Sequence, residues 1–243
     1  MFQDRMLLRY MSLSSYMTIS DFGGKMIITT VIFDLDGTLL DTLDDLKDSM
    51  NYTLGRYGHP CITREQARSY VGNGIAKFLE LALPKGRNDP DFDMCLEIFR
   101  EHYSHNMENR TRPYQNIPEL LKILKDKGYR TAIVSNKFDA AVKNLSRKYF
   151  DPYIDAAIGD SPDIKRKPAP DSVYKALREL GSAKEESVYI GDSDIDAYTA
   201  MNSGLMFIGV SWGFRDSGLL YSLGAKTVIN DPMELPAFLD TEP

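Results

Sequence analysis

Short apolar runs alternate with amphipathic segments along most of this chain. From residue 27 onward, runs rich in Val, Ile, Phe and Ala are followed by segments in which apolar side chains recur every three or four positions. This alternation is typical of strand–helix units built around a parallel sheet. The predicted strands are residues 27–33, 130–135, 156–159, 188–191, 206–210 and 227–229.

Start and stop signals delimit three of the intervening helices. Pro118 stands at the start of one predicted helix and Gly128 at its end, because proline fits the first turn of a helix and glycine fits the position after its last turn. Asp139 begins a second helix, and a third begins at Pro170 and ends at Gly181. We therefore expect an α/β fold: a Rossmann-like parallel sheet with helices on both faces.

The strand pattern stops between residues 42 and 110, a stretch too long for a simple loop. Thr63 is a candidate helix N-cap there, and residues 92–107 have the pattern of a long helix. Four apolar residues recur at spacings of three and four, as on one face of a helix: Leu43, Leu46, Met50 and Leu54. We expect a small all-helical cap domain at residues 42–110, inserted into a core domain made of residues 26–41 and 111–243.

Residues 1–25 follow neither pattern. Met, Ser and Tyr are scattered through them, and Arg9 interrupts the first short apolar run before it reaches the length that a secretory signal needs. We expect an extension without regular structure or a misplaced start, with Met26 as the start of translation.

Composition excludes several classes of partner. The chain has 243 residues, of which 43% are hydrophobic and 26% are charged, and no apolar run approaches the roughly 18 residues that span a bilayer. A formal net charge of −6 argues against nucleic acid as the main partner. We expect a cytoplasmic protein without membrane or nucleic-acid partners; the sequence does not indicate an oligomeric state.

The cysteines and histidines form no recognisable metal or disulfide motif. Cys61 and Cys95 lie 34 positions apart without a CxxC pattern, which favours free thiols in packing positions. His59, His102 and His105 have no evident acidic partner, so we expect them at the surface or in packing contacts.

Two aspartates end the first predicted strand. Asp34 and Asp36 are two residues apart, so their side chains leave the strand on the same side. Gly37 permits a sharp turn after them, and Thr38 adds a hydroxyl that can hydrogen-bond to the next segment. An Asp-Gly dipeptide alone is more typical of a plain turn. Two carboxylates this close repel each other unless a cation lies between them, which favours a catalytic or metal-binding role.

Polar residues also follow two later strands. Ser135 and Asn136 stand at the end of the strand at 130–135, the edge at which ligands bind in open α/β sheets. Lys167 lies in a basic run that in isolation would be a solvated patch, but the proline directly after it restricts the direction in which the chain leaves. Lys137, next to Asn136, is expected to be solvated. Trp212, after the fifth predicted strand, is expected to pack near the rim of the site.

Three aspartates follow the strand at 188–191, and this density of carboxylates needs counter-charge. They are Asp192, Asp194 and Asp196. An EF-hand calcium loop is excluded, because the twelfth position counted from Asp192 is Ser203 and not glutamate.

Together these elements resemble the haloacid dehalogenase superfamily. The string from Asp34 to Thr38 matches the first motif of that superfamily, Asp-x-Asp-Gly-Thr, at every position, and Ser135, Lys167 and Asp192 stand where its later motifs are expected. The resemblance extends over nearly the whole chain from Met26 onward.

The resemblance implies a role for each matched residue. Asp34 would be the nucleophile and Asp36 the general acid/base. Ser135, Asn136, Thr38 and Lys167 would bind the substrate. The implied cofactor is Mg²⁺, with Asp34, the backbone carbonyl of Asp36 and Asp192 as ligands, while Asp196 would bind the metal or orient its surroundings. Asp194 is expected outside the site.

Gly72, Asn73 and Gly74 separate two predicted helices of the cap. Any single glycine there is more typical of a helix end followed by a restart. The loop also resembles the specificity loop of phosphoglycolate phosphatase-like members, which implies that its backbone N–H groups bind a small carboxylate.

The expected function is Mg²⁺-dependent hydrolysis of a small phosphorylated metabolite, with 2-phosphoglycolate as the leading candidate. The resemblance leaves open a β-phosphoglucomutase-like isomerase, whose Arg-Glu-Asp-Ser cap loop is only approximated by residues 63–66, and a pyrophosphatase or nucleotidase. A non-enzymatic phospho-aspartate switch is disfavoured by Asp36 and by the helical insertion.

Overall fold

The computed structural model describes residues 27–241. The predictions for the first 25 residues and for a start at Met26 lie outside the described residues.

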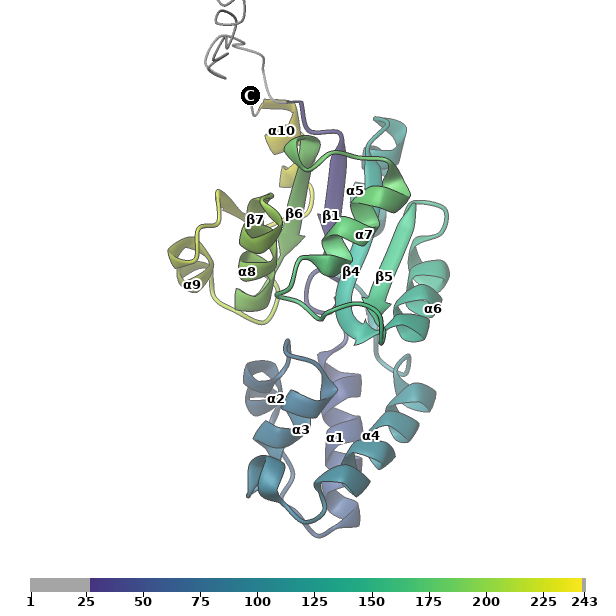
Figure 1. Cartoon of the computed structure of the whole chain (residues 1–243), viewed down its shortest axis with the longest axis vertical. Helices are drawn as coiled ribbons and strands as arrows, with labels where there is room; N and C mark the ends of the chain where they lie inside the picture. Colours follow the sequence, from purple (N-terminus) through teal and green to yellow (C-terminus); the bar gives the residue numbers. More distant parts are fainter. Residues whose placement is uncertain (1–26, 242–243) are drawn as a thin grey trace, which may run out of the picture.

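A six-stranded parallel sheet in the order β5-β4-β1-β6-β7-β8 forms the centre of the larger part of the molecule (Figure 1). Its strands are β1 (Thr30–Phe33), β4 (Arg130–Phe138), β5 (Ala156–Asp160), β6 (Ser187–Gly191), β7 (Met206–Val210) and β8 (Thr227–Ile229). The six predicted strands are confirmed, although β1 begins three residues later than expected and β4 continues three residues further. The strands read as apolar runs because both faces of the sheet are covered.

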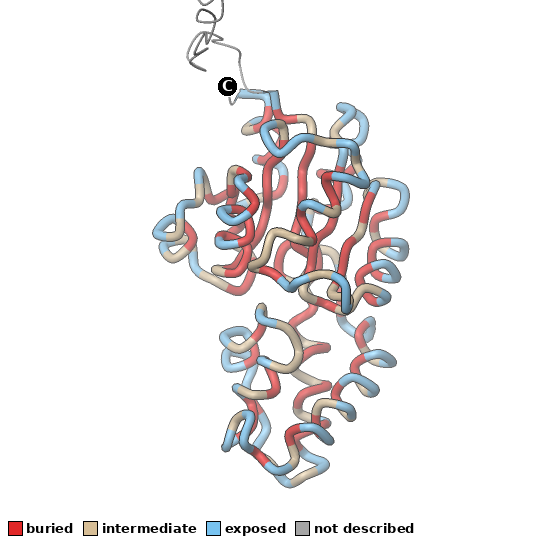
Figure 2. The backbone as a smooth tube through the Cα atoms, in the orientation of Figure 1, coloured by how far each residue is buried: buried red, intermediate tan, exposed pale blue. Residues whose placement is uncertain are grey.

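Helices cover both faces of the sheet, which confirms the predicted fold class. Val31 and Phe33 belong to a core cluster with residues of α5 (Ile117–Asp126), α6 (Asp139–Phe150) and α10 (Glu234–Thr241). Ile32, between them on β1, belongs to a second cluster with residues of α7 (Asp171–Leu180), α8 (Asp194–Ser203) and α9 (Ser217–Ser222). Successive strand residues point to opposite faces, so one strand contributes to both layers. Figure 2 shows the strands as almost continuously buried.

The helical insert lies between β2 (Leu40–Asp41) and β3 (Arg112–Pro113), which pair with each other in antiparallel fashion. It contains α1 (Leu43–Arg56), α2 (Arg64–Tyr70), α3 (Ile75–Ala82), a 3₁₀ helix (Gly86–Asn88) and α4 (Phe92–Asn106). Thr63 caps α2 through a reciprocal contact with Gln66, as expected from the sequence. The β2–β3 pair was not predicted, because two residues per strand are too few to show a period. The domain boundaries at residues 42 and 110 stay a prediction.

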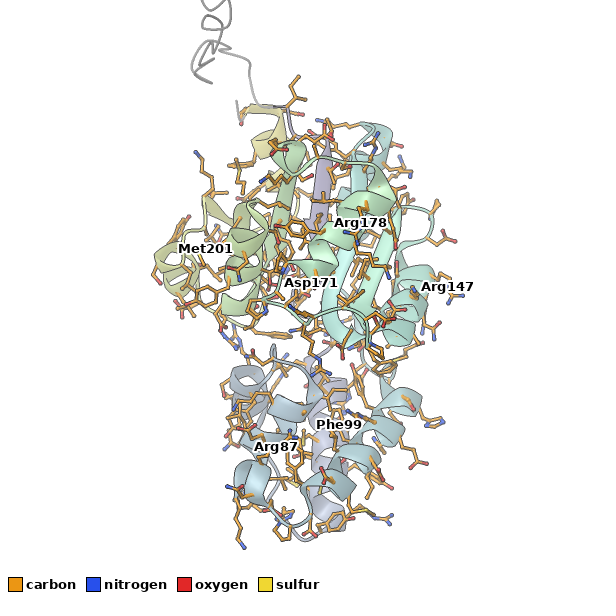
Figure 3. All side chains as sticks on the ribbon, viewed as in Figure 1. Arg87, Phe99, Arg147, Asp171, Arg178 and Met201 are labelled. Carbon is orange, nitrogen blue, oxygen red and sulfur yellow. The ribbon has the colours of Figure 1, made fainter. Side chains whose placement is uncertain are left out.

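The apolar residues of the insert form a third core cluster, which also includes Ala141 of α6 and Phe214 of the sheet domain. Phe99 of α4 lies inside it, with its ring 5.9 Å from that of Phe78 and 5.6 Å from that of Tyr103, whereas Met201 of α8 lies on the outside of the molecule (Figure 3). None of the helices within residues 27–241 is long and apolar enough to cross a membrane.

Two expectations about cysteine and histidine were wrong. Cys95 is buried in the core of the insert, but Cys61 is exposed and does not pack there; both are free cysteines. His59 has acidic neighbours after all, because its Nε2 lies 3.6 Å from a carboxylate oxygen of Asp91 and 3.8 Å from one of Asp89. These partners lie thirty or more positions away along the chain, so no local pattern indicated them.

His102 also has partners. Its ring stacks on Tyr52 at 4.0 Å, and its Nδ1 lies 3.1 Å from the hydroxyl of Ser49. Both partners belong to α1, which packs against α4, so His102 is a packing residue. Trp212 packs on the core cluster of β1 and donates a hydrogen bond from Nε1 to the carbonyl of Thr38 at 3.0 Å.

A buried carboxylate ties the two connections of the insert together. Asp45, in the first turn of α1, accepts hydrogen bonds from the backbone N–H groups of Arg110 at 3.0 Å and Thr111 at 2.8 Å. These two residues lie where the chain returns from α4 to β3. A carboxylate that accepts several backbone N–H bonds is held strongly, because the bonds are charge-assisted.

Replacing this carboxylate is expected to destabilise the protein. Asp45→Asn leaves a single acceptor oxygen for two backbone donors, so we expect the free energy of unfolding in urea to fall by about 1–3 kcal/mol. Asp44→Asn is the matched control, because Asp44 is in the same turn but forms exposed ion pairs with Lys47 and Arg64, which contribute about 1 kcal/mol or less. Equal losses in the two variants would contradict the anchoring role.

Candidate active site

Three neighbouring strands deliver polar side chains to one edge of the sheet. Asp34 follows β1, Ser135 lies in β4 and Asp192 follows β6, and β1 lies between the other two strands. Because the strands are parallel, these residues meet at the carboxyl edge, where ligands bind in open α/β sheets. The helical insert lies beyond this edge (Figure 1).

A cavity of ≈ 60 Å³ lies between the sheet edge and the insert. Seven of the predicted site residues line it: Asp34, Asp36, Ser135, Asn136, Lys167, Gly72 and Gly74. Five apolar residues, four of them from the insert, form another part of its wall: Leu46, Val71, Ile75, Phe78 and Phe214. Asn73 is exposed and does not line the cavity, so its contact with substrate stays a prediction.

Three buried carboxylates form a group that could hold a metal ion. Oxygen atoms of Asp34, Asp192 and Asp196 all lie within 4.8 Å of one another. Burial raises the pKa of Asp34 well above its ordinary value, and the neighbouring carboxylates add to the effect of burial while Lys167 opposes it. Burial likewise raises the pKa of Asp192 to about 7, with a further contribution from Asp196. Both shifts disfavour the charged carboxylates, and a cation bound between them would favour the charged forms.

Glycines make room for this group of acids. A Cβ on Gly37 would lie 2.5 Å from a carboxylate oxygen of Asp192, and one on Gly213 would lie 2.2 Å from the Asp192 Cβ. Gly37 also has a φ of +93°, which residues with a side chain rarely adopt. The donor set of buried carboxylate oxygens fits a hard divalent cation such as Mg²⁺ or Ca²⁺.

Asp196 has donors on both of its oxygens. Oδ1 accepts hydrogen bonds from Lys167 Nζ at 2.8 Å and Tyr189 OH at 3.1 Å. Oδ2 accepts from the backbone N–H groups of Asp192 and Ser193 and from the Ser193 hydroxyl. These contacts favour an orienting role for Asp196 over direct metal binding.

Lys167 joins the nucleophile candidate to Asp196. Its Nζ donates to Asp34 Oδ1 at 2.7 Å, to Asp196 Oδ1 at 2.8 Å and to Tyr189 OH at 3.0 Å. Burial alone would lower the pKa of Lys167, but Asp196 and Asp34 outweigh burial and raise it well above its ordinary value. Lys167 is therefore a fixed cation. Tyr189 was missed from the sequence, although a tyrosine in a fully buried strand needs a partner for its hydroxyl.

Ser135, Asn136 and Thr38 hold the site by different contacts. The hydroxyl of Ser135 accepts from the backbone N–H of Lys137 at 3.2 Å, which leaves its own O–H free to donate to a ligand. The amide of Asn136 bonds both backbone groups of Lys167 and the carbonyl of Gly72. Thr38 donates to Asp192 Oδ1 at 2.8 Å and does not line the cavity. The direct substrate contacts of Asn136 and Thr38 stay predictions.

The expectation that Lys137 is solvated was wrong. Its side chain is only 3% exposed, because Nζ bonds Asp36 Oδ1 at 2.9 Å and the hydroxyl of Tyr103 at 2.6 Å. Burial would lower the pKa of Lys137, but Asp36 and Tyr103 outweigh burial and raise it. Tyr103 comes from α4 of the insert, and no pattern in the sequence indicated that a residue there would lie so close to Asp36.

Two arginines bind the insert to the rim of the site. Arg68 of α2 donates to the carbonyls of Gly213 at 2.6 Å and Phe214 at 2.9 Å. Arg215 donates to the carbonyls of Arg68 and Val71 and to Asp194 Oδ1, which places Asp194 outside the acidic group, as expected. The backbone N–H of Phe214 in turn donates to Asp192 Oδ2 at 2.7 Å. The contacts of the insert thus continue to a candidate metal ligand.

Comparison with known proteins agrees with this geometry. Residues 31–210 match the family model of haloacid dehalogenase-like hydrolases. Phosphoglycolate phosphatase of Aquifex aeolicus is 33% identical over 189 residues, which cover 76% of this chain and 85% of the relative. A protein of Caldanaerobacter subterraneus, provisionally described as the pyrophosphatase PpaX, is 32% identical over 209 residues, 86% of this chain and 93% of that relative.

A solved structure is similar over the same range. The crystal structure of a protein from Lactobacillus delbrueckii, provisionally described as a phosphoglycolate phosphatase, has a TM-score of 0.83 and 32% identity, and the match covers 89% of this chain and 99% of that one. The family model spans well over half of the sequence, and its range contains each of the residues that meet at the sheet edge. On both grounds, this chain belongs to the haloacid dehalogenase-like hydrolases.

Proposed function

We propose that this protein is a Mg²⁺-dependent phosphatase that hydrolyses a small phosphomonoester through a phosphorylated Asp34. The observation that carries the proposal is the contact of Asp34 with Lys167 at 2.7 Å, beside two further buried carboxylates at the sheet edge. A buried carboxylate held by a fixed cation is suited to nucleophilic attack on a phosphoryl group.

Charge neutralisation comes first. Asp34, Asp192 and the carbonyl of Asp36 would hold the Mg²⁺, which supplies positive charge so that a phosphate ester can approach a carboxylate. Lys167 supplies a second positive charge beside Asp34. The free O–H of Ser135 binds a phosphoryl oxygen and fixes the direction of approach.

The reaction has two half-steps that share one acid/base group. A carboxylate oxygen of Asp34 bonds to phosphorus as the ester P–O bond breaks, and Asp36 gives its proton to the departing alkoxide. Water then attacks the phosphorus of the phosphorylated Asp34, Asp36 takes a proton from that water, and inorganic phosphate leaves. Asp36 lines the cavity beside Asp34, which supports this role.

The relatives and the loop of the insert support a small substrate, with 2-phosphoglycolate as the best candidate. Several relatives are named phosphoglycolate phosphatases. The Gly72–Gly74 loop lines the cavity. The two free cysteines support a reducing, cytoplasmic compartment.

A substrate panel tests this function. Phosphate release in MgCl₂ is measured for 2-phosphoglycolate, pyrophosphate and β-glucose 1-phosphate. We expect kcat/KM to be highest for 2-phosphoglycolate by about tenfold or more, because only that substrate combines a small size with one phosphoryl group. A preference for pyrophosphate would instead favour the activity described for the Caldanaerobacter relative, and formation of glucose 6-phosphate would favour the mutase.

Removing the nucleophile is expected to abolish turnover. Asp34→Asn keeps the shape of the side chain but lacks the attacking carboxylate, so activity should fall below about a thousandth of the wild-type value. Circular dichroism and thermal unfolding check that the variant is folded. Asp163→Asn, an exposed position, is the control and should keep full activity. An active Asp34→Asn protein would refute the assignment.

Stability should depend on pH and Mg²⁺ through Asp192. Its folded pKa of about 7 exceeds the ordinary value of 3.8, so between about pH 4 and 7 the folded state binds more protons than the unfolded state. In the presence of EDTA, the contribution of Asp192 to the free energy of unfolding therefore falls as the pH rises through that window, by on the order of 4 kcal/mol. Asp192→Asn should reduce this slope.

Binding of Mg²⁺ should reverse this fall in the free energy of unfolding. At pH 8, Mg²⁺ at a hundredfold excess over its Kd should raise the free energy of unfolding by about 2.7 kcal/mol, and by less at pH 5, where protonated carboxylates bind metal poorly. Urea unfolding measures both effects. An undiminished Mg²⁺ effect in Asp192→Asn would show that the metal binds elsewhere.

A further inference from the structure

One buried cation of the cavity has no role in the proposed reaction. Lys137 lies at the carboxyl end of β4, two residues after Ser135, and lines the cavity. Removing an ammonium group from water is costly, and an apolar residue would fill this place without that cost. A role for this cation in choosing the substrate rests on the proposed phosphatase function.

Lys137 and Tyr103 keep hydrogen-bond donors that the described residues do not use. Two of the three N–H bonds of the ammonium go to Asp36 and to the hydroxyl oxygen of Tyr103. That hydroxyl accepts from Lys137, so its own O–H can still donate. The third N–H and this O–H have no acceptor among residues 27–241, and both side chains line the cavity. Together they form a pair of donors, one of them positively charged.

The position of Asp36 places this pair on the leaving-group side. Lys167 contacts Asp34 and Asp196, which lie with the nucleophile and the candidate metal ligands. Lys137 contacts Asp36, the group that gives its proton to the departing oxygen, and Tyr103 of the insert. If Asp36 protonates the departing oxygen, the organic part of the ester would lie beside Lys137.

The surroundings select for a small negative group at that place. Lys137 and Lys167 are the cations that line the cavity in the described part of the chain, and much of the wall formed by the insert is apolar. In a poorly solvated space a single ammonium attracts one anionic group strongly. Lys137 contacts Asp36 directly, so an anionic group that binds Lys137 would lie close to the ester oxygen.

We propose that Lys137, held in place by Tyr103, is a specificity residue that binds the carboxylate of the leaving group. The protein would then select phosphate esters of short 2-hydroxy acids over uncharged esters of the same size.

A matched pair of substrates tests the proposal. 2-Phosphoglycolate and its amide, 2-phosphoglycolamide, have nearly the same shape and differ in the charge next to the ester. We expect the wild-type protein to prefer the acid by about 10- to 100-fold in kcat/KM, the range of one charged hydrogen bond. Lys137→Met should bring the ratio of kcat/KM for the acid to kcat/KM for the amide close to one, chiefly by raising KM for the acid.

Three further variants test whether the preference for the acid depends on the positive charge at Lys137 and on the hydroxyl of Tyr103. Lys137→Arg keeps the positive charge and should retain most of the preference. Tyr103→Phe removes only the hydroxyl and should lower the ratio by about three- to tenfold. Lys143→Met is the control for the loss of a lysine charge, since Lys143 is exposed on α6 and pairs with Asp139; it should leave the ratio unchanged. An equal loss on both esters in Lys137→Met would overturn the proposal, because Lys137 would then act only through Asp36.

Measurements of ester binding test the role of Lys137 independently of the proposed phosphatase activity. In protein that carries Asp34→Asn, calorimetry measures the Kd of both esters without turnover. Tighter binding of the acid that is lost on adding Lys137→Met supports the proposal, and equal binding of acid and amide overturns it. If the wild-type protein hydrolyses neither ester but its Asp34→Asn form still prefers the acid, the phosphatase function fails while the role of Lys137 stands.

Discussion

The contact of one buried ammonium group with two buried carboxylates is the constraint on which the site depends. Lys167 bonds Asp34 and Asp196 in a region where Asp192 is also buried. Without that ammonium, only neutral hydrogen-bond donors would offset the cost of removing three acids from water and their mutual repulsion. Three carboxylates face one ammonium, so the group has room for a further positive charge. A metal-dependent hydrolase supplies that charge with its cofactor.

Backbone geometry around these acids follows from the same constraint. A Cβ on Gly191 would lie 2.4 Å from the Cβ of Asp196, and Gly37 and Gly213 leave equally little room beside Asp192. Any side chain at these positions would force the carboxylates apart. The glycines therefore make room for the group of acids as well as serving the backbone conformation at each position.

The insert takes part in the site through polar contacts as well as by covering it. Arg68 bonds the carbonyls of Gly213 and Phe214, and Phe214 bonds Asp192 through its N–H. Tyr103 bonds Lys137, which bonds Asp36. Both candidate functional regions, the acidic group and the acid/base residue, are thus connected to the insert by chains of hydrogen bonds. Displacement of the insert would break these hydrogen bonds.

The local pattern of apolar and polar residues was sufficient to predict the fold class and the motif residues of the core domain. All six strands of the sheet and the starts of several helices were predictable, because a buried strand and a helix cap are set by residues close together in the sequence. Asp34, Ser135 and Asp192 were identifiable because each ends such a strand, and parallel strands bring their ends to one edge. Lys167 was found from its match to a family motif, since a basic run alone indicates no site.

Tertiary structure decided the remainder of the site. Five residues that contribute to the site have partners that became apparent only from the tertiary packing, because they come from different elements and share no motif: Lys137, Tyr103, Tyr189, Arg68 and Arg215. The same holds for His59 and its acidic neighbours. The sequence does not show whether a charged side chain is solvated or buried, because segments distant along the chain determine its environment. Such segments bury Lys137 and make it a cation of the cavity.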